Sequence, residues 1–307
     1  MSRFETSAKE IPAGVNYILG GSAGMAGMFL VYPFDLVKTR MQVSEASMKA
    51  KEYKTSFHVF YSVIKNEGFL GLSKGMGAAL LRQATYTTAR LGVYNNLLQL
   101  YRENYQEQPS LSTLLVIGMM AGICGAFVGN PADVVLIRMA ADGRLPHAER
   151  RNYGNVVRAL YRIPIEEGPL ALLKGVFPTM GRAIIINMCQ LGTYSYFKNL
   201  LKADPFRLTE GILLHFDASM LAGILVTIAS LPLDIAKTRI QNQKDAKYKD
   251  TPHVMGHIIK NEGFFALWKG LTPYYLRLGP HTVLTLMFYE QFKNLYRFYT
   301  SPPKAGL

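Results

Sequence analysis

Three arginines at equivalent places in three repeated segments have the chemistry to bind an anion with two carboxylates. Arg82, Arg182 and Arg277 each lie seven residues after the glycine of a Lys-Gly pair. A guanidinium keeps its proton and is costly in lipid, so three of them converging inside a bundle favour a dianion as their ligand. The planar fork of arginine also suits bidentate carboxylate binding. Threefold pseudosymmetry would place the three side chains at one depth around one axis, and we expect a dianion site there.

The residues one and two helical turns beyond these arginines differ among the repeats, which could select one substrate shape. They are Tyr86 and Arg90 in the first repeat, Ile186 and Gln190 in the second, and His281 and Thr285 in the third. Tyr86, Asn187 or Gln190 would contact a hydroxyl or keto group. Arg90 serves either the substrate or the cytoplasmic closure, and His281 taken alone is better explained as a hydrogen-bonded packing residue than as a proton carrier. The candidate substrate-binding residues are Arg82, Tyr86, Arg90, Arg182, Asn187, Gln190, Arg277 and His281.

A second set of charges closes the first apolar run of each repeat. Residues 33–40, 131–138 and 232–239 share the pattern Pro-x-Asp-x-x-Lys-x-Arg, except that Leu136 replaces the lysine of the second copy. A proline inside a helix removes a backbone donor and bends the helix. Asp and Lys three residues apart lie on one helix face. Three bent helices that present charged ends to one another indicate a plug that can open and close.

The elements that position these residues recur three times along the 307 residues. Each repeat is expected to hold an apolar helix, a polar loop, a short amphipathic helix (about 54–66 in the first copy), a Glu-Gly turn and a second long helix. The repeats cover about 11–108, 109–206 and 207–300. The sequence therefore predicts an all-α membrane protein with six transmembrane helices, the odd ones kinked at proline, and three short helices on one face. Residues 1–307 would form a single domain.

The composition restricts the class of protein further. Hydrophobic residues make up 49% of the chain, yet the mean hydropathy is only +0.09, so the clustering of apolar residues carries the membrane signal. The net charge of +13 suits nucleic acid, anionic lipid or small anions as partners. The two cysteines show neither metal spacing nor a disulfide framework, so we expect no metal site. Residues 1–12 resemble neither a secretory signal nor a transit peptide. No catalytic motif is present, and we expect no enzyme activity.

The tripled proline pattern and the Glu-Gly and Lys-Gly pairs resemble those of the mitochondrial carrier family over the whole chain. Residues 81–92, 138–146 and 274–285 are similar to the members that exchange 2-oxoglutarate for malate. The resemblance implies an antiporter of the mitochondrial inner membrane with both termini on the intermembrane-space side. It also implies a functional monomer, small dicarboxylate substrates and bound cardiolipin.

Two gates follow from this resemblance. The matrix gate would consist of Asp35, Lys38, Gln42, Asp133, Asp234, Lys237 and Gln241. The family pattern implies that each acid pairs with the base of the preceding repeat, which would leave Asp234 without a partner because of Leu136. The glutamines would brace the ion pairs, whereas Ala140 in the second repeat has no group to do so. We therefore expect a weakened matrix gate.

The cytoplasmic gate is expected to be looser than the matrix gate. Its candidate residues are Tyr94, Tyr194, Lys198, Tyr289, Glu290 and Lys293. Only the third repeat holds both an acid and a base at the two charged positions. This gate would close mainly by packing of apolar and tyrosine side chains.

The Lys-Gly turns precede helices whose first backbone N–H groups are free to bind an anion. The resemblance implies cardiolipin at these positions. They are Lys74, Gly75, Lys174, Gly175, Lys269 and Gly270. Surface lysines after a turn are the simpler explanation.

Exchange of 2-oxoglutarate for malate by alternating access is the function that this pattern favours. A dicarboxylate/phosphate exchanger or an uncoupling-type proton transporter would share the fold and the three arginines. A basic nucleic-acid-binding protein would need its basic residues on exposed faces with interleaved aromatic residues, whereas many here lie within apolar helices. A scaffold that has lost transport would have no use for three buried arginines.

Overall fold

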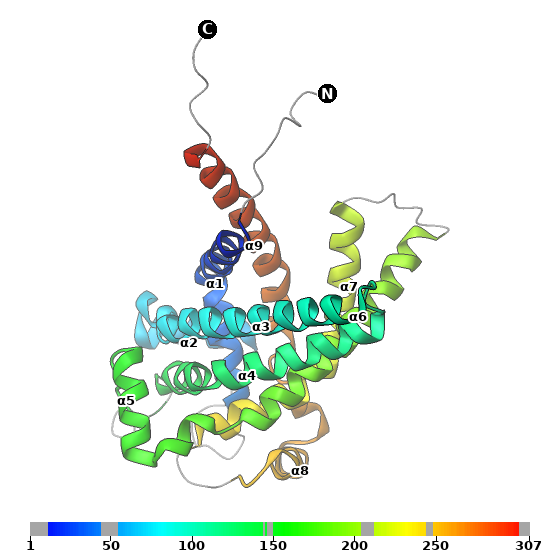
Figure 1. The fold of residues 1–307 in the computed structure, drawn as a ribbon. Helices are drawn as coiled ribbons and strands as arrows, with labels where there is room; N and C mark the ends of the chain where they lie inside the picture. The colour runs from blue at the N-terminus through cyan, green and yellow to red at the C-terminus, as the bar shows by residue number, and fades with distance from the viewer. Residues whose placement is uncertain are drawn as a thin grey trace.

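The computed structural model of the chain describes residues 12–43, 55–143, 145, 150–203, 212–243 and 248–300. These ranges are helical along most of their length (Figure 1). The elements are α1 (Ala13–Val43), α2 (Ser56–Glu67), η1 (Phe69–Ser73), α3 (Met76–Tyr105), α4 (Leu111–Asp142), α5 (Val156–Glu167), η3 (Pro169–Leu173), α6 (Val176–Lys202), α7 (Ile212–Asn242), α8 (Thr251–Glu262), η4 (Phe264–Trp268) and α9 (Leu271–Thr300). The order long, short, long occurs three times, as the sequence predicts.

The six long helices form a closed ring. Each contacts the next in the order α1, α3, α4, α6, α7 and α9, and α9 returns to α1. The most extensive contacts join different repeats, namely α3 with α4, α6 with α7 and α9 with α1, and Figure 1 shows α1 beside α9. Each repeat thus buries its apolar surface against its neighbours.

The three helices that carry the proline segments meet one another at one end of the ring. Pro33, Pro131 and Pro232 lie within α1, α4 and α7. These three helices contact each other in addition to their ring neighbours. Charged residues just after the prolines are buried there, including Asp35, which is only 7% exposed. The bundle is therefore closed at the matrix-gate end.

Each short helix begins with a side-chain cap and ends at a glycine. Thr55, Asn155 and Asp250 accept hydrogen bonds from the backbone N–H three residues on, which satisfies donors that a helix leaves unpaired. The glycine of each Glu-Gly turn has a positive φ, which is 74° at Gly68 and favours glycine on steric grounds. In α2, Val59 faces inward and is buried. The short helix predicted over about 54–66 thus occupies Ser56–Glu67.

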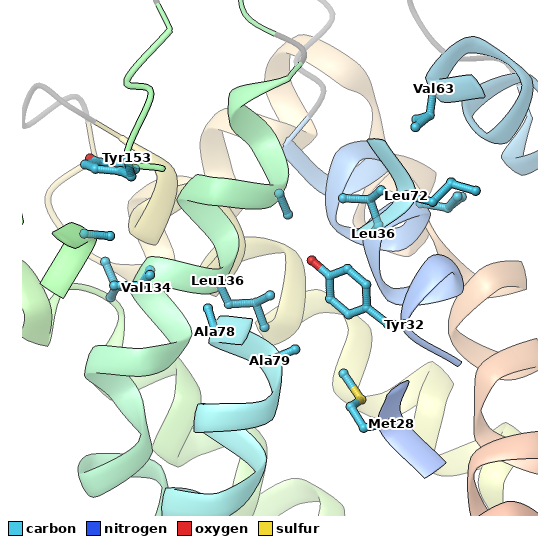
Figure 2. Close-up of a cluster of buried hydrophobic side chains, with 14 of the residues drawn as sticks. Met28, Tyr32, Leu36, Val63, Leu72, Ala78, Ala79, Val134, Leu136 and Tyr153 are labelled. Atoms are coloured by element: carbon cyan, nitrogen blue, oxygen red, sulfur yellow. The ribbon is translucent and has the colours of Figure 1, made fainter. Parts of the chain in front are cut away.

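A cluster of buried apolar side chains joins the first and second repeats beside the gate (Figure 2). It includes Met28, Tyr32, Leu36, Val63, Leu72, Ala78, Ala79, Val134, Leu136 and Tyr153. Close van der Waals packing of this kind holds helices together in a membrane. The Tyr32 hydroxyl donates a hydrogen bond to the Lys74 carbonyl, which satisfies a polar group inside this cluster.

The outer surface of the ring is apolar in a repeated pattern. Within the described ranges, three stretches are long and apolar enough to cross a membrane: Leu111–Asp142, Pro169–Lys202 and Asp217–Asn242. Phe29 and Leu30 of α1 are exposed, and so are Phe127 and Val128 at the same register of α4. Lipid is the environment in which such exposed side chains are stable.

Candidate functional site

The three arginines of the predicted dianion site each lie beside an aspartate of the matrix gate. They project from α3, α6 and α9, and each reaches the aspartate of the following repeat. The pairs are Arg82 with Asp133 (3.8 Å), Arg182 with Asp234 (2.9 Å) and Arg277 with Asp35 (2.5 Å). Each arginine side chain is about one-fifth exposed. The sequence suggested two separate sets of charges, and the structure joins them into one.

The lysines of the gate add a second cation to two of the aspartates. Lys38 forms an ion pair with Asp234, and Lys237 forms one with Asp133. Asp234 and Asp133 are therefore each paired with the lysine of the following repeat. The prediction that each acid uses the preceding repeat was wrong, and Asp234 has a partner. Three residues turn a helix by about 300°, so Asp and Lys lie about 60° apart on one helix face, and the order of helices around the ring decides which neighbour each meets.

Asp35 is the aspartate that has no lysine partner, because Leu136 occupies the position in the second repeat that is equivalent to Lys38 and Lys237. Leu136 packs instead in the apolar cluster with Tyr32 and Ala79 (Figure 2). Arg277 is the cation that binds Asp35, through Nη1 and Oδ1. Among the described residues Asp35 is therefore paired with its site arginine alone, whereas Asp133 and Asp234 each have an arginine and a lysine.

The two predicted bracing glutamines behave differently. Gln42 donates from Nε2 to Asp234 Oδ2 at 3.3 Å and accepts from the Thr238 hydroxyl, so it braces an ion pair. Gln241 donates instead to Asn130 Oδ1 at 3.1 Å. Asn130 in turn donates to the Leu172 carbonyl. Gln241 therefore ties α7 to α4 rather than bracing the lysine pair, which corrects the prediction for this residue.

A second ring of charges, which was not predicted from the sequence, surrounds the gate. The last arginine of each proline segment donates from Nε to a backbone carbonyl of the next repeat and from its terminal nitrogens to the glutamate of its own Glu-Gly turn. The bonds are Arg40 to Ala140 and Glu67, Arg138 to Gln241 and Glu167, and Arg239 to Gln42 and Glu262. Each guanidinium therefore links a short helix to the neighbouring repeat.

The glutamates of this outer ring lie where the short helices end. Burial raises the pKa of Glu67, but the hydrogen bonds from Arg40 and Lys74 outweigh that effect and hold the pKa below its ordinary value. The pKa values of Glu167 and Glu262 are lowered in the same way by their own arginine and lysine. All three side chains therefore remain ionised at neutral pH.

Further along α3, polar side chains line a recess of about 310 Å³. It is formed by Tyr86, Thr87, Arg90, Leu91 and Tyr94. The Arg90 guanidinium lies 3.4 Å from the Asn187 carboxamide oxygen on α6. Asn187 is buried against Gly122, where an added Cβ would lie 2.9 Å from its Nδ2. Two predicted substrate residues from different helices are thus brought together.

Two buried polar atoms of the third repeat have no hydrogen-bond partner among the described residues. They are His281 Nε2 and Thr285 Oγ1, and the latter lies against Gly27 of α1, where an added Cβ would be 2.7 Å from it. A buried polar atom without a partner is costly, so a ligand that bonds to it would gain affinity. Gln190 lies in α6, but its side chain is outside the described part of the structure.

The residues of the predicted cytoplasmic gate are less buried than those of the matrix gate. Lys293 lies over the ring of Tyr289 at 5.1 Å within α9, and Glu290 is exposed. Tyr194 packs against an apolar cluster that includes Leu214 of α7. Tyr94 lines the recess on α3, and Lys198 is half-buried.

The three predicted lipid-binding turns share one local geometry. Lys74, Lys174 and Lys269 each donate to the glutamate seven residues earlier, at 2.7–2.8 Å. Gly75 and Gly175 have left-handed backbones and cap the start of α3 and α6, and Gly270 also has a positive φ. A cavity of about 430 Å³ lies between the first two repeats, lined by residues 73–77, 139, 142–143, 150 and 152–156.

One further residue of this region was missed. Tyr274 accepts a hydrogen bond from Arg182 Nη2 at 2.7 Å, and Lys38 Nζ lies 3.6 Å from the centre of its ring. The available signal was its place on α9, one turn before Arg277 on the same face. The equivalent residues of the other repeats, Ala79 and Thr179, gave no hint of such a role.

Comparison with known proteins places the chain among membrane carriers. The family model described as "Mitochondrial carrier protein" matches residues 9–105, 107–205 and 209–300. The mitochondrial 2-oxoglutarate/malate carrier protein of Homo sapiens is 52% identical over 290 residues, which cover 93% of this chain and 92% of the relative. The protein of the same name from Caenorhabditis elegans is 52% identical over 291 residues, covering 93% and 94%. The mitochondrial citrate transporter F of Aspergillus niger is 38% identical over 280 residues, covering 91% and 88%.

Proposed function

The chain belongs to the mitochondrial carrier family, and we propose that it exchanges 2-oxoglutarate for malate or related dicarboxylates across the mitochondrial inner membrane. Two relatives that are 52% identical carry the name of that exchange. The family is one of multi-pass membrane transporters, and no chemical reaction is part of the proposal.

The observation that carries the mechanism is that each site arginine binds a gate aspartate. A dicarboxylate that enters from the open end offers its own carboxylates to Arg82, Arg182 or Arg277. Each arginine that turns to the substrate leaves its aspartate with one cation fewer. The closed gate is thereby weakened only when substrate is bound, which is the coupling that an exchanger needs.

The substrate must bind the intermediate, occluded state better than either open state, because a ligand shifts an equilibrium only by its differential affinity. Charge-assisted bonds from guanidinium to carboxylate supply that affinity. Tyr86, Arg90 and Asn187 supply hydrogen bonds to a keto or hydroxyl group, and His281 offers a further polar atom. Exchange of one dianion for another carries no net charge across the membrane.

The orientation and the lipid partner complete the proposal. Both termini face the intermembrane space, and the monomer is the functional unit. Cardiolipin phosphate binds at the Lys-Gly turns, where the first backbone N–H groups of α3, α6 and α9 have no acceptor within their own helix. Because Lys74 is held by Glu67 at 2.8 Å, the backbone rather than the lysine carries most of this interaction in the first repeat. Nucleic acid is not a partner.

The test of the function is uptake of labelled 2-oxoglutarate into liposomes that contain the purified protein. The internal solution would hold malate, 2-oxoglutarate, phosphate or no substrate. We expect uptake only with internal malate or 2-oxoglutarate. Uptake against phosphate would assign the protein to dicarboxylate/phosphate exchange, and a proton leak without dicarboxylate uptake would assign it to the uncoupling type.

The lipid proposal has its own measurement. Cardiolipin added to the detergent-purified protein should raise its melting temperature, whereas phosphatidylcholine should not. Gly75 has φ 87° and lies against the Tyr32 hydroxyl, so Gly75→Ala should reduce the cardiolipin shift. Equal shifts with both lipids would contradict a specific site.

A further inference from the structure

Tyr274 connects a substrate arginine to a gate lysine. It lies on α9 and is only 4% exposed. Its hydroxyl accepts from Arg182 Nη2 at 2.7 Å, and Lys38 Nζ lies 3.6 Å from its ring centre. Both of these cations also bind Asp234, with Arg182 Nε at 2.9 Å from Oδ1 and Lys38 on Oδ2. Four side chains from α1, α6, α7 and α9 thus form a closed circuit around one carboxylate.

The other two repeats lack this circuit. In the first repeat, Ala79 stands at the position equivalent to Tyr274. The corresponding gate residue is Leu136 rather than a lysine, and both residues pack in the same apolar cluster. Thr179 stands there in the second repeat, but its hydroxyl donates to the Gly175 carbonyl of its own helix at 2.7 Å. Arg82 remains 3.8 Å from its aspartate. The most tightly held arginine–aspartate–lysine set is therefore the one that contains Tyr274.

The two parts of the tyrosine side chain act on different neighbours. The electron-rich face of an aromatic ring attracts an ammonium group, and this attraction is stronger away from water. The hydroxyl oxygen accepts a charge-assisted hydrogen bond, which restricts the orientation of the guanidinium. The ring therefore acts on Lys38 in the closed gate, and the hydroxyl acts on Arg182 in the substrate site.

We propose that Tyr274 is a positioning residue for the exchange reaction, orienting Arg182 for the substrate and holding Lys38 in the closed gate. This inference rests on the proposed dicarboxylate exchange. It makes the third repeat the place where substrate binding and gate closure are joined through one side chain. The effect of the hydroxyl on Arg182 can be measured separately from the effect of the ring on Lys38, because Tyr274→Phe keeps the ring and removes only the hydroxyl.

The experiment compares wild type, Tyr274→Phe, Tyr274→Leu and Tyr275→Phe in liposomes, with KM and maximal rate of 2-oxoglutarate/malate exchange as readouts. Tyr274→Phe should raise KM about 3- to 10-fold and change the maximal rate less than about 2-fold. Tyr274→Leu should raise KM similarly and also increase the maximal rate at least about 2-fold, because the closed gate loses the ring over Lys38. Tyr275→Phe is the matched control, since that hydroxyl lies 3.5 Å from the Met220 carbonyl on α7.

A wild-type KM in Tyr274→Phe would overturn the role of the hydroxyl, and so would an equal rise in Tyr275→Phe. A maximal rate in Tyr274→Leu equal to that of Tyr274→Phe would overturn the role of the ring. Tyr274→Met serves as the non-aromatic variant if the leucine variant does not fold. The wild-type measurement separates this inference from the function itself. Absence of dicarboxylate exchange in the wild type would refute the proposed function, whereas an active wild type with unaffected variants would refute only the role of Tyr274.

Discussion

Restoring the missing lysine of the matrix gate, with Leu136→Lys, should slow exchange. By threefold equivalence the new ammonium reaches Asp35, as Lys237 reaches Asp133 and Lys38 reaches Asp234. Asp35 would then have two cations instead of Arg277 alone. The closed gate becomes more stable, and each turnover must break one more ion pair.

The expected decrease in exchange rate follows from opposing contributions to the stability of the closed gate. A hydrogen bond to a charged group contributes about 1.5–3 kcal/mol net. Burial of a lysine costs free energy, but Lys38 and Lys237 are already accommodated at 7% and 6% exposure in equivalent positions. The lysine stem keeps much of the apolar packing of Leu136. If the bond forms, a stabilisation of about 1.5–3 kcal/mol slows opening roughly 10- to 100-fold.

The assay is the initial rate of exchange at saturating 2-oxoglutarate in liposomes, together with the melting temperature of the purified protein. Leu136→Met is the control, because it changes the packing without adding charge, and it should exchange at nearly the wild-type rate. A higher melting temperature with an unchanged rate would mean that gate opening does not limit turnover. If Leu136→Lys equals Leu136→Met in both measurements, Arg277 already neutralises Asp35 fully and the reasoning is wrong.

Three further predictions follow from the contacts around the gate. Arg277→Ala and Arg82→Ala should both nearly abolish exchange. Arg277→Ala should lower the melting temperature more, because Asp35 then has no cation, whereas Asp133 keeps Lys237, and a buried charge left unpaired costs about 3–5 kcal/mol. Equal melting temperatures of the two variants would contradict the pairing. The lowered pKa values of the three short-helix glutamates mean that their stabilisation is complete above the ordinary glutamate pKa and is lost as the pH falls through the lowered values. The melting temperature should therefore drop on acidification, with a shallower drop in Glu262→Gln, and a profile unaffected by that change would refute the assignment. Gly122→Ala should raise KM, because the new Cβ meets the Asn187 side chain at 2.9 Å, whereas Gly21→Ala, with nothing within 4 Å, should not; equal effects would mean that helix propensity rather than contact is responsible.

Much of the fold was predictable because the same sequence pattern occurs in all three repeats. The proline segments, the Glu-Gly turns and the Lys-Gly pairs set the order of long and short helices, and local rules place their ends. The three arginines at one register correctly indicated that they are equivalent in space. Pseudosymmetry made these features predictable because it relates residues that are distant in the chain through a local sequence pattern.

Relations across the ring were harder to predict. The direction in which each aspartate pairs depends on how the helices are ordered around the axis, and a pattern along the chain does not contain that order. The bond from Arg277 to Asp35 was hidden for the same reason, since the two residues are 242 positions apart. Tyr274 was missed because its partners lie on two other helices. Gln241 was assigned by analogy with Gln42, but the nearby Asn130 offers it a different acceptor.

The two rings of charges at the gate differ in completeness, and this difference makes one boundary between repeats unlike the other two. The outer arginine–glutamate ring has the same links at all three boundaries between repeats, so it resists separation equally in every direction. The inner lysine–aspartate ring has links at two boundaries and a leucine at the third, between α1 and α4. Parting of the helices at that boundary separates apolar side chains, whereas at the other two boundaries it must also break a lysine–aspartate pair. A ring of three equivalent repeats is thus closed by two kinds of contact, and only the two lysine–aspartate boundaries must separate a lysine from its aspartate when the gate opens.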